Sequence, residues 1–516
     1  MKKRLAKALS LALCLTMTLG ILASCGGNPE SSDGSGSSDT SGTGEVRDTL
    51  TVAISDDIPS MSPFEVCNGL SQLSYDIVYE KLFVVTPEGE VVPQLVESYN
   101  QVSDTQYDFK LKEGVLFHDG TELTAEDVKA SLDNAGTYPV PAVHEKEVTV
   151  TGKYTFTITT PKPDALLLYD DLAVKWNSIV PKKLLEEGHD FKTDPIGSGP
   201  YRFVDRATSE YVRFESFEDY RSDPSTDGRI KNIVFKIIPE PSSRTIALEN
   251  GEVDFILDPE LMDLQRMIDN PNIEVNEAQG QRLFNLTLNK TQPGLDNIYV
   301  RKAIAYAIDP QPVMDVALNG YGSINRTIIL SGYPGCTEVN AATYDPEKAK
   351  EYLAMSGYAP GELTFDAVPV DGGQALTVIQ SQLAEIGINL NIVNQEDAVW
   401  IDESAAGEHT ILFIANSGAT STYSNLNLMF HSSRIGAANR TLTSDPELDG
   451  WLEELTYTFD EAEIEDLYHK CSEFIQDDCA LIPLFINKTY LPHAADLTGF
   501  DYGPYGEYYL YQVRVK

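Results

Sequence analysis

The chain has few basic residues and few cysteines. It carries 38 Lys and Arg against 79 Asp and Glu, so its formal net charge is −41 at pH 7. A surface this acidic repels phosphate backbones, which argues against nucleic-acid binding. The six cysteines have spacings that match no metal-ligand pattern. We therefore expect no metal site and no cofactor.

The motifs of common extracellular hydrolases are also absent. Neither His-Glu-x-x-His nor Gly-x-Ser-x-Gly occurs, and no two of the seven histidines lie four residues apart. A metalloprotease needs the first motif, and a serine hydrolase usually shows the second. We predict that the protein is not an enzyme, and an extracellular hydrolase remains the rival interpretation.

Long hydrophobic runs are missing after the first 22 residues. Four basic residues among the first seven precede an apolar run from 8 to 22, a pattern typical of an export signal and too short for a confident membrane span. The next residues, LASC, resemble a bacterial lipobox, whose cysteine is diacylated and becomes the mature N-terminus. We expect a signal peptide over 1–24, lipidation of Cys25 and attachment to the outer face of the cytoplasmic membrane, in the periplasmic space if an outer membrane exists. The alternative is an ordinary secretory peptide cut near Ala23.

Residues 26–45 are rich in Gly, Ser, Thr and Asp. Such a segment buries nothing and forms a flexible tether with a reach of roughly 25 Å. Loss of residues 1–24, which carry four positive charges and no acids, takes the mature chain to about −45. After removal of the signal and lipidation of Cys25, four cysteines remain: Cys67, Cys336, Cys471 and Cys479. Disulfides are permitted outside the cell, but the sequence does not pair them.

The rest of the chain alternates strand and helix patterns. Residues 48–55 (DTLTVAIS) read as a strand, 69–82 as a helix, and the alternation of Tyr107, Phe109 and Leu111 as another strand. Two helices are separated at Asp309-Pro310. About 470 residues with this alternation predict an α/β protein of two or three domains.

Two polar motifs are interpreted as structural. His118 and Asp119 have no nucleophile or metal ligand in the same motif, so we read them as a turn. Gly197-Ser198-Gly199 lacks the later glycine, the lysine and the helix start of a phosphate-binding loop. We predict a tight backbone turn there.

Six segments, taken together and in order, resemble the extracellular solute-binding proteins of ABC importers, family 5, the peptide, dipeptide and nickel binders. They are KLKEGVLFHDGTELTAEDVKASL, DPIGSGPYRFV, IVFKIIPEPSSRTIALENGEVDF, RKAIAYAID, YDPEKAKEYL and IQSQLAEIGI. The resemblance covers residues 48–516. It implies a two-lobed, type II periplasmic-binding-protein-like α/β fold with an additional α/β domain. By the same resemblance, one lobe comprises 46–88, 195–284 and 485–516, the extra domain 89–194, and the second lobe 285–484.

The resemblance also implies a function. A peptide or peptide-like small solute is captured between two lobes, and the closed form docks on an ABC permease and ATPase complex; we expect a monomer. The alternatives within this fold are an oligosaccharide, a nickel or metal chelate, or a surface sensor that passes the solute to a receptor.

One segment departs from the family pattern. Peptide-binding relatives usually hold the free amino group of the ligand with an aspartate near this point, yet residues 409–444 contain no Asp or Glu. We predict that this segment does not hold a free peptide amine in the usual way, because a buried ammonium without its carboxylate typically costs about 3 to 5 kcal/mol. The lining is instead expected from hydroxyls and amides: Asn416, Ser417, Thr420, Thr422, Tyr423 and Asn425. Neutral polar ligands such as sugars, or peptides with blocked or differently anchored amines, suit such a lining. The alternative is an exposed loop, with the charge partner supplied by Glu65, Asp371 or Glu396.

Other pocket candidates follow from their position in the resembling segments. They are Met61, Asn68, Tyr201 and Trp400. Arg434 and Arg440 are placed to meet a ligand carboxylate, although exposed arginines are commoner.

Overall fold

The computed structural model describes residues 47–65, 69–86, 90–135, 144–221, 228–331, 333–370, 373–417, 421–503 and 506–516. Within these ranges, no helix combines the length and the apolar character needed to span a bilayer.

An 11-stranded mixed sheet runs through the described part of the chain. Its strands, in order across the sheet, are β15 (Ile388–Ile392), β14 (Leu363–Pro369), β16 (Ile411–Ser417), β12 (Ile273–Leu288), β17 (Leu481–Ala494), β11 (Phe255–Ile256), β1 (Thr49–Ile54), β10 (Asn232–Ile237), β9 (Tyr211–Ser216) and β8 (Tyr201–Ala207), with β13 (Gly322–Ile324) also paired to β17. β1 pairs in parallel with β10 and β11, and β14 with β15 and β16. The predicted α/β class is therefore observed, and the parallel strands are buried as such strands usually are.

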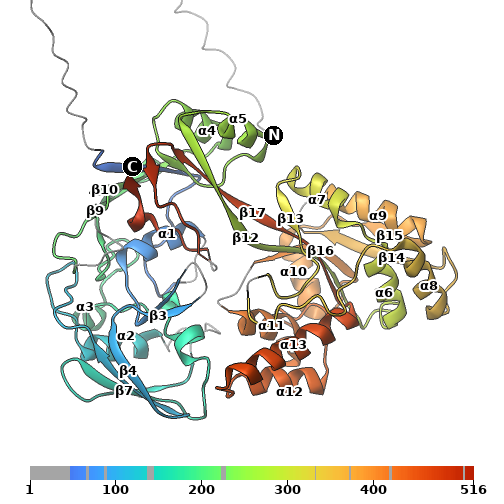
Figure 1. Cartoon of the computed structure of the whole chain (residues 1–516), viewed down its shortest axis with the longest axis horizontal. Helices are drawn as coiled ribbons and strands as arrows, with labels where there is room; N and C mark the ends of the chain where they lie inside the picture. Colours follow the sequence, from blue (N-terminus) through green and yellow to red (C-terminus); the bar gives the residue numbers. More distant parts are fainter. Residues whose placement is uncertain are drawn as a thin grey trace, which may run out of the picture. The chain divides into compact units, whose positions relative to one another are not determined.

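Two long antiparallel strands, β12 and β17, lie side by side at the centre of this sheet (Figure 1). The first half of β12 pairs with residues 488–494, and its second half pairs with residues 481–486 and with β16. The register shifts between Gln279 and Leu283. Gly280 lies at this shift, where a Cβ would come 2.5 Å from Asn487 O. The close approach of the two backbones therefore requires glycine at this position.

A smaller four-stranded antiparallel sheet has the order β4-β5-β7-β6. Its strands are β4 (Val96–Ser103), β5 (Gln106–Leu111), β7 (Thr155–Thr159) and β6 (Glu147–Val150). Tyr107, Phe109 and Leu111 of β5 are buried as the alternation predicts. Two short antiparallel strand pairs complete the described strands: β2 (Phe83–Val85) with β3 (Val91–Pro93), and β18 (Leu497–Thr498) with β19 (Arg514–Val515).

The helices of the described ranges are α1 (Gly69–Val78), α2 (Ala125–Ala135), α3 (Lys182–Glu187), α4 (Pro241–Glu249), α5 (Leu264–Ile268), α6 (Ile298–Ala307), α7 (Pro310–Leu318), α8 (Pro346–Ser356), α9 (Ala375–Glu385), α10 (Asp397–Ala406), α11 (Thr422–Phe430), α12 (Pro446–Leu455) and α13 (Glu461–Asp478). An Asp-Pro pair starts α7, α8 and α12. In each, the aspartate accepts a hydrogen bond from a backbone N–H of the first turn, and the proline occupies the first helical position. Both features favour a helix start, which explains why α6 and α7 separate at Asp309-Pro310.

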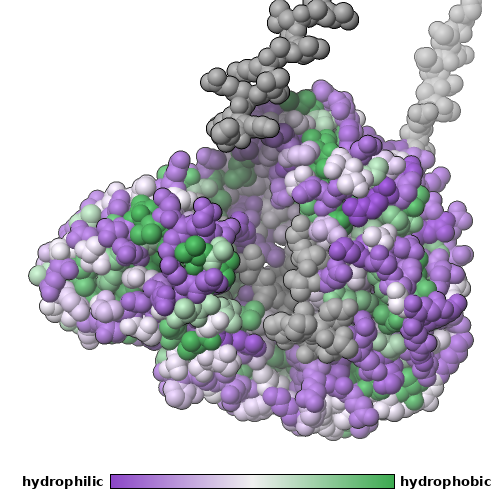
Figure 2. All heavy atoms as spheres, turned by 180° about the vertical axis from the view of Figure 1, so that it is seen from behind, coloured by the Kyte–Doolittle hydropathy of each residue, from purple (hydrophilic) through white to green (hydrophobic). Residues whose placement is uncertain are grey.

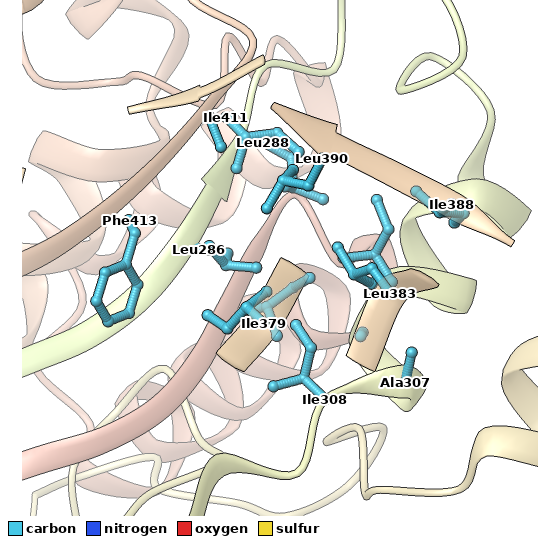
Figure 3. Close-up of a cluster of buried hydrophobic side chains, with 14 of the residues drawn as sticks. Leu286, Leu288, Ala307, Ile308, Ile379, Leu383, Ile388, Leu390, Ile411 and Phe413 are labelled. Atoms are coloured by element: carbon cyan, nitrogen blue, oxygen red, sulfur yellow. The ribbon is translucent and has the colours of Figure 1, made fainter. Parts of the chain in front are cut away.

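Three large hydrophobic clusters fill the described body. One draws its buried members from residues 284–485, a second from 82–179, and a third mainly from 50–79, 201–257 and 491–513. Figure 3 shows part of the first, where Leu286 of β12, Phe413 of β16 and Ile379 of α9 belong to one cluster. Truncation of one such large buried side chain to alanine typically lowers the free energy of unfolding by about 2 to 5 kcal/mol.

The two motifs interpreted as turns are joined to each other. His118 N–H donates to Gly197 O at 2.9 Å, and Gly197 N–H donates to His118 Nδ1 at 3.4 Å. Nδ1 therefore accepts, so Nε2 carries the proton and donates to Gly199 O at 2.9 Å. A Cβ on Gly199 would come 2.6 Å from Ile77 O. His118 and Asp119 lie in a turn as predicted, and the chain bends at residues 198–200.

Hydrophilic residues cover most of the face in Figure 2, with hydrophobic atoms in scattered patches. This surface agrees with the acidic composition. Cys336, Cys471 and Cys479 are free thiols, and Cys67 lies outside the described residues.

Candidate functional site

A cavity of about 400 Å³ lies between two segments that are far apart in sequence. One wall comes from residues 144–170 and the other from residues 423–456. Hydrogen bonds between described residues join the walls: the Ser424 hydroxyl donates to Asp170 Oδ2 at 3.1 Å, and Ala165 N–H donates to Thr456 O at 2.9 Å. The cavity therefore exists only where these two segments meet.

A single π-helical turn, Leu167–Asp171, places the acids of the first wall. It is closed by Leu172 N–H donating to Leu167 O at 2.9 Å. The wider turn puts two consecutive aspartates, Asp170 and Asp171, into the protein interior. Single π-turns are rare and are frequent at functional sites.

Asp170 is 1% exposed and lines the cavity. Its Oδ2 accepts from Ser424, whereas its Oδ1 has no hydrogen-bond partner among the described residues. Burial raises the pKa of Asp170 to about 6, although the Ser421 hydroxyl, the nearby His144 and the Ser424 hydroxyl oppose that rise. Burial in a medium of low polarity disfavours a carboxylate, so a positive group at Oδ1 would stabilise the charged form.

Two further acids close to Asp170, the buried Asp171 and the half-buried Asp164, already have partners. Asp171 forms an ion pair with Lys146 Nζ at 2.7 Å and accepts from Asn177 Nδ2 at 2.6 Å. Asp164 Oδ2 lies 2.7 Å from His144 Nδ1. Burial opposes the charge of His144, but the bond to Asp164 and the nearby aspartates outweigh it and raise the pKa of His144.

The second wall begins at helix α11. The Ser421 hydroxyl accepts from Ser424 N–H and so caps the helix. On the side that lines the cavity, the Tyr423 hydroxyl accepts from Asn427 Nδ2 at 3.1 Å, and Arg434 Nε donates to Asn427 Oδ1 at 3.0 Å. Tyr423, Asn427 and Arg434 all line the cavity, so this wall offers hydroxyl, amide and guanidinium groups and no acid.

Of the residues predicted from the acid-free segment, the structure places some at the cavity and others away from it. Tyr423 lines the cavity, while Thr422, its neighbour on α11, is buried. The Asn416 amide lies 3.4 Å from Met429 Sδ and is not among the lining residues. Ser417 ends β16, but its side chain and Thr420 lie outside what the structure describes. A ligand-binding role for Asn416, Ser417 and Thr422 stays a prediction.

The candidates from other segments are not brought to this cavity. Met61 and Tyr201 are fully buried in one hydrophobic cluster, and the Tyr201 hydroxyl donates to Ile230 O at 2.6 Å. Trp400 of α10 packs in a small hydrophobic cluster with residues of β14 and β16. The Arg440 guanidinium lies 5.3 Å from the centroid of its ring. Their pocket roles stay predictions. Asn68 and the predicted lipidation site Cys25 lie outside the described residues.

The acids considered as alternative charge partners do not line the cavity either. Glu65 lies 3.8 Å from Lys192 Nζ, Glu396 is exposed at the start of α10, and Asp371 lies outside the described residues. Asp170 is not among the residues predicted from the sequence. A signal was present, because two adjacent acids interrupt the apolar run ALLLYDDLAV, and a buried acid must be paired or serve a function.

No group of three or more His, Cys, Asp or Glu among the described residues is placed to hold a metal ion. The lining side chains themselves offer charge, hydrogen bonds and apolar contact.

Comparison with known proteins gives consistent results. Heme-binding protein A of Haemophilus influenzae is 28% identical over 496 residues, covering 88% of this chain and 90% of that protein. Glutathione-binding protein GsiB of Escherichia coli is 26% identical over 472 residues, covering 87% and 91%. The solved structure of HbpA2 from Haemophilus parasuis superposes with a TM-score of 0.82 at 25% identity, covering 91% of this chain and all of that one.

A family model, bacterial extracellular solute-binding proteins, family 5 (middle), matches residues 90–437. The match contains both walls of the cavity up to Arg434 and spans more than half of the chain. The chain therefore belongs to family 5 of the bacterial extracellular solute-binding proteins.

Proposed function

We propose that the protein captures a small peptide-like solute and delivers it to an ABC import permease and its ATPase. The family match carries this proposal. A solute that contacts two segments at once stabilises the closed arrangement, in which both segments touch it, over the open one. The permease can then distinguish the solute-bound form from the empty form. The cavity between residues 144–170 and 423–456 has this property.

The polar lining of the cavity supports a peptide-like solute. Arg434 lines the cavity, and its guanidinium complements a carboxylate on a small molecule. One relative is named for glutathione, itself a peptide. A volume of about 400 Å³ falls within the range of small-molecule sites.

We further propose that a lipid on Cys25 and the tether over 26–45 hold the protein at the outer face of the cytoplasmic membrane. The lobes are proposed as 46–88 plus 195–284 plus 485–516, and 285–484, with 89–194 as the extra domain. Support for this division comes from the large hydrophobic clusters, one of which lies within 284–485 and another within 82–179.

The proposal is tested by recovering the solute. Protein purified without refolding is mildly denatured, and the released small molecules are identified by mass spectrometry. We expect a peptide-like molecule that returns unchanged after renewed incubation with the protein. A sugar, a metal chelate or a chemically altered product would contradict the proposal. Uptake of the labelled molecule by cells with and without the permease gene then separates import from sensing.

A further inference from the structure

We propose that the solute carries an apolar side chain, of about the size of leucine, which is held between Leu166 of one wall and Leu428 of the other. This inference rests on the proposed solute-binding function and names one part of the solute. Both leucines are half-buried and line the cavity from opposite walls.

Neither leucine belongs to a hydrophobic cluster of the described residues, although their neighbours do. Leu167 is buried in one large cluster and Leu426 in another. One half-buried leucine needs no explanation, but two that line the same cavity from opposite walls form a shared apolar surface. The packing energy that Leu166 and Leu428 do not gain within the protein is available to an apolar group that enters between them.

The pattern of helix α11 also sets Leu428 apart. Leu426 and Phe430 are buried on the face that packs into the protein. A second face lines the cavity with Tyr423, Ser424, Asn427 and Leu428. The face of an amphipathic helix that points away from its core is usually polar, so a leucine there breaks the pattern and calls for an apolar partner.

Several polar groups of the lining already bond within the protein. The Asn427 amide donates to the Tyr423 hydroxyl and accepts from Arg434 Nε. The Thr160 hydroxyl donates to the carbonyl of Lys162 at 2.7 Å. A solute that bonded to these groups would first have to replace existing hydrogen bonds, which leaves little net gain. The apolar part of the lining therefore contributes most of the selectivity.

The prolines of the first wall extend this apolar surface. Pro161 and Pro163 line the cavity together with Leu166, and the fixed ring of proline loses little entropy when it is covered. An apolar group between Leu166 and Leu428 removes apolar surface of both walls from water at once. It therefore favours the arrangement in which the walls meet.

The test uses the full chain and two sets of tripeptides. One set carries a single leucine at the first, second or third position among alanines, and the other carries asparagine, which has a similar shape, at the same positions. Calorimetry gives the affinity of each peptide. We expect the best leucine peptide to bind about 10-fold to 100-fold more tightly than its asparagine counterpart, because its side chain leaves water.

The variants Leu166→Asn and Leu428→Asn are each expected to reduce this preference to less than about threefold. The matched control is Val399→Asn, at an exposed apolar position of α10 that does not line the cavity, for which the preference should persist. Equal binding of both sets by the natural protein would overturn the apolar subsite and leave solute binding standing. Binding of neither set would overturn the peptide-like solute and this inference with it. The comparison within the natural protein remains valid even if a variant fails to fold.

Discussion

Asp170 and Asp171 are consecutive buried acids on one π-helical turn, yet among the described residues only Asp171 forms an ion pair, with Lys146 at 2.7 Å. The amide of Asn177 and the backbone N–H of His144 add to the pairing of Asp171. Asp171 therefore holds the first wall together, whereas Asp170, a lining residue of the cavity, has a buried Oδ1 without a hydrogen-bond partner among the described residues. Two neighbouring residues of the same type thus have opposite effects on the unliganded protein.

The substitution Asp170→Asn is expected to stabilise the unliganded protein near pH 7.5. A carboxyl whose pKa is raised on folding is favourable below its unfolded pKa, near 4, and loses that contribution as the pH rises through its folded pKa, about 6. The free energy of unfolding of the variant should therefore exceed that of the natural protein by about 3 kcal/mol at most at pH 7.5. This difference falls towards zero near pH 4. Urea unfolding at several pH values measures it.

Asp171→Asn is the matched control with the opposite sign. It leaves the enclosed Lys146 ammonium without its carboxylate, which typically costs about 3 to 5 kcal/mol. If both variants shifted the unfolding free energy in the same direction, the distinction between the two aspartates would be wrong.

Ser424→Ala is expected to weaken binding of a tripeptide about tenfold at pH 7.5, because it removes a hydrogen bond to a charged group that joins the two walls. The hydroxyl donates to Asp170 Oδ2 and helps to keep the pKa of Asp170 from rising further. The neutral carboxyl accepts a weaker hydrogen bond than the carboxylate. The loss of affinity should therefore shrink as the pH drops through the pKa of Asp170.

Calorimetry as a function of pH measures both effects of Ser424→Ala. The control is Ser381→Ala, an exposed serine of α9 that donates only to Thr377 O. A loss of affinity without a change in the pH profile would indicate that Ser424 acts through packing alone.

Much of the fold could be predicted because local patterns dictate it. The alternation of Tyr107 and Phe109 marks β5, and Asp309-Pro310 separates α6 from α7 as expected. The predicted family, fold class and non-enzymatic binding function are confirmed by the family match and the structural comparison.

The cavity could not be predicted in the same way. Asp170 meets Ser424 across 254 residues, and no local pattern encodes a contact of that range. The apolar run around Asp170 also favours an ordinary helix or strand over a π-turn. The sequence alone shows that residues 409–444 contain no acid. It does not show that Asp170, from a distant segment, lies opposite them in the cavity.

His118→Ala is expected to destabilise the protein by about 2 to 4 kcal/mol, because it leaves Gly197 N–H and Gly199 O without their partner in an enclosed region. Burial lowers the pKa of His118 to about 4, so the neutral ring contributes stability that is complete above pH 6.5 and lost as the pH falls through 4. Denaturant unfolding at pH 7.5 measures the loss. His469→Ala, at a partly exposed position of α13, should change the unfolding free energy by less than about 0.5 kcal/mol.

Gly280→Ala is expected to disturb the sheet at the point where the register of β12 shifts. The added methyl group would come 2.5 Å from Asn487 O and would overlap the Asn487 side chain, whose Oδ1 accepts from Arg282 N–H at 2.9 Å. Neither strand can move away from this contact without losing hydrogen bonds of the sheet. We therefore expect the free energy of unfolding to fall by about 2 to 4 kcal/mol.

Gly450→Ala provides the control for this substitution. Gly450 lies within α12 and a Cβ there would meet nothing within 4 Å, so alanine should stabilise the protein by about 0.5 to 1 kcal/mol through its better helix propensity. Urea unfolding of both variants gives the two values, and calorimetry with a free-amine tripeptide shows whether the β12–β17 junction also affects capture. A Gly280→Ala protein as stable as the natural one would show that the two strands tolerate a wider separation than their pairing implies.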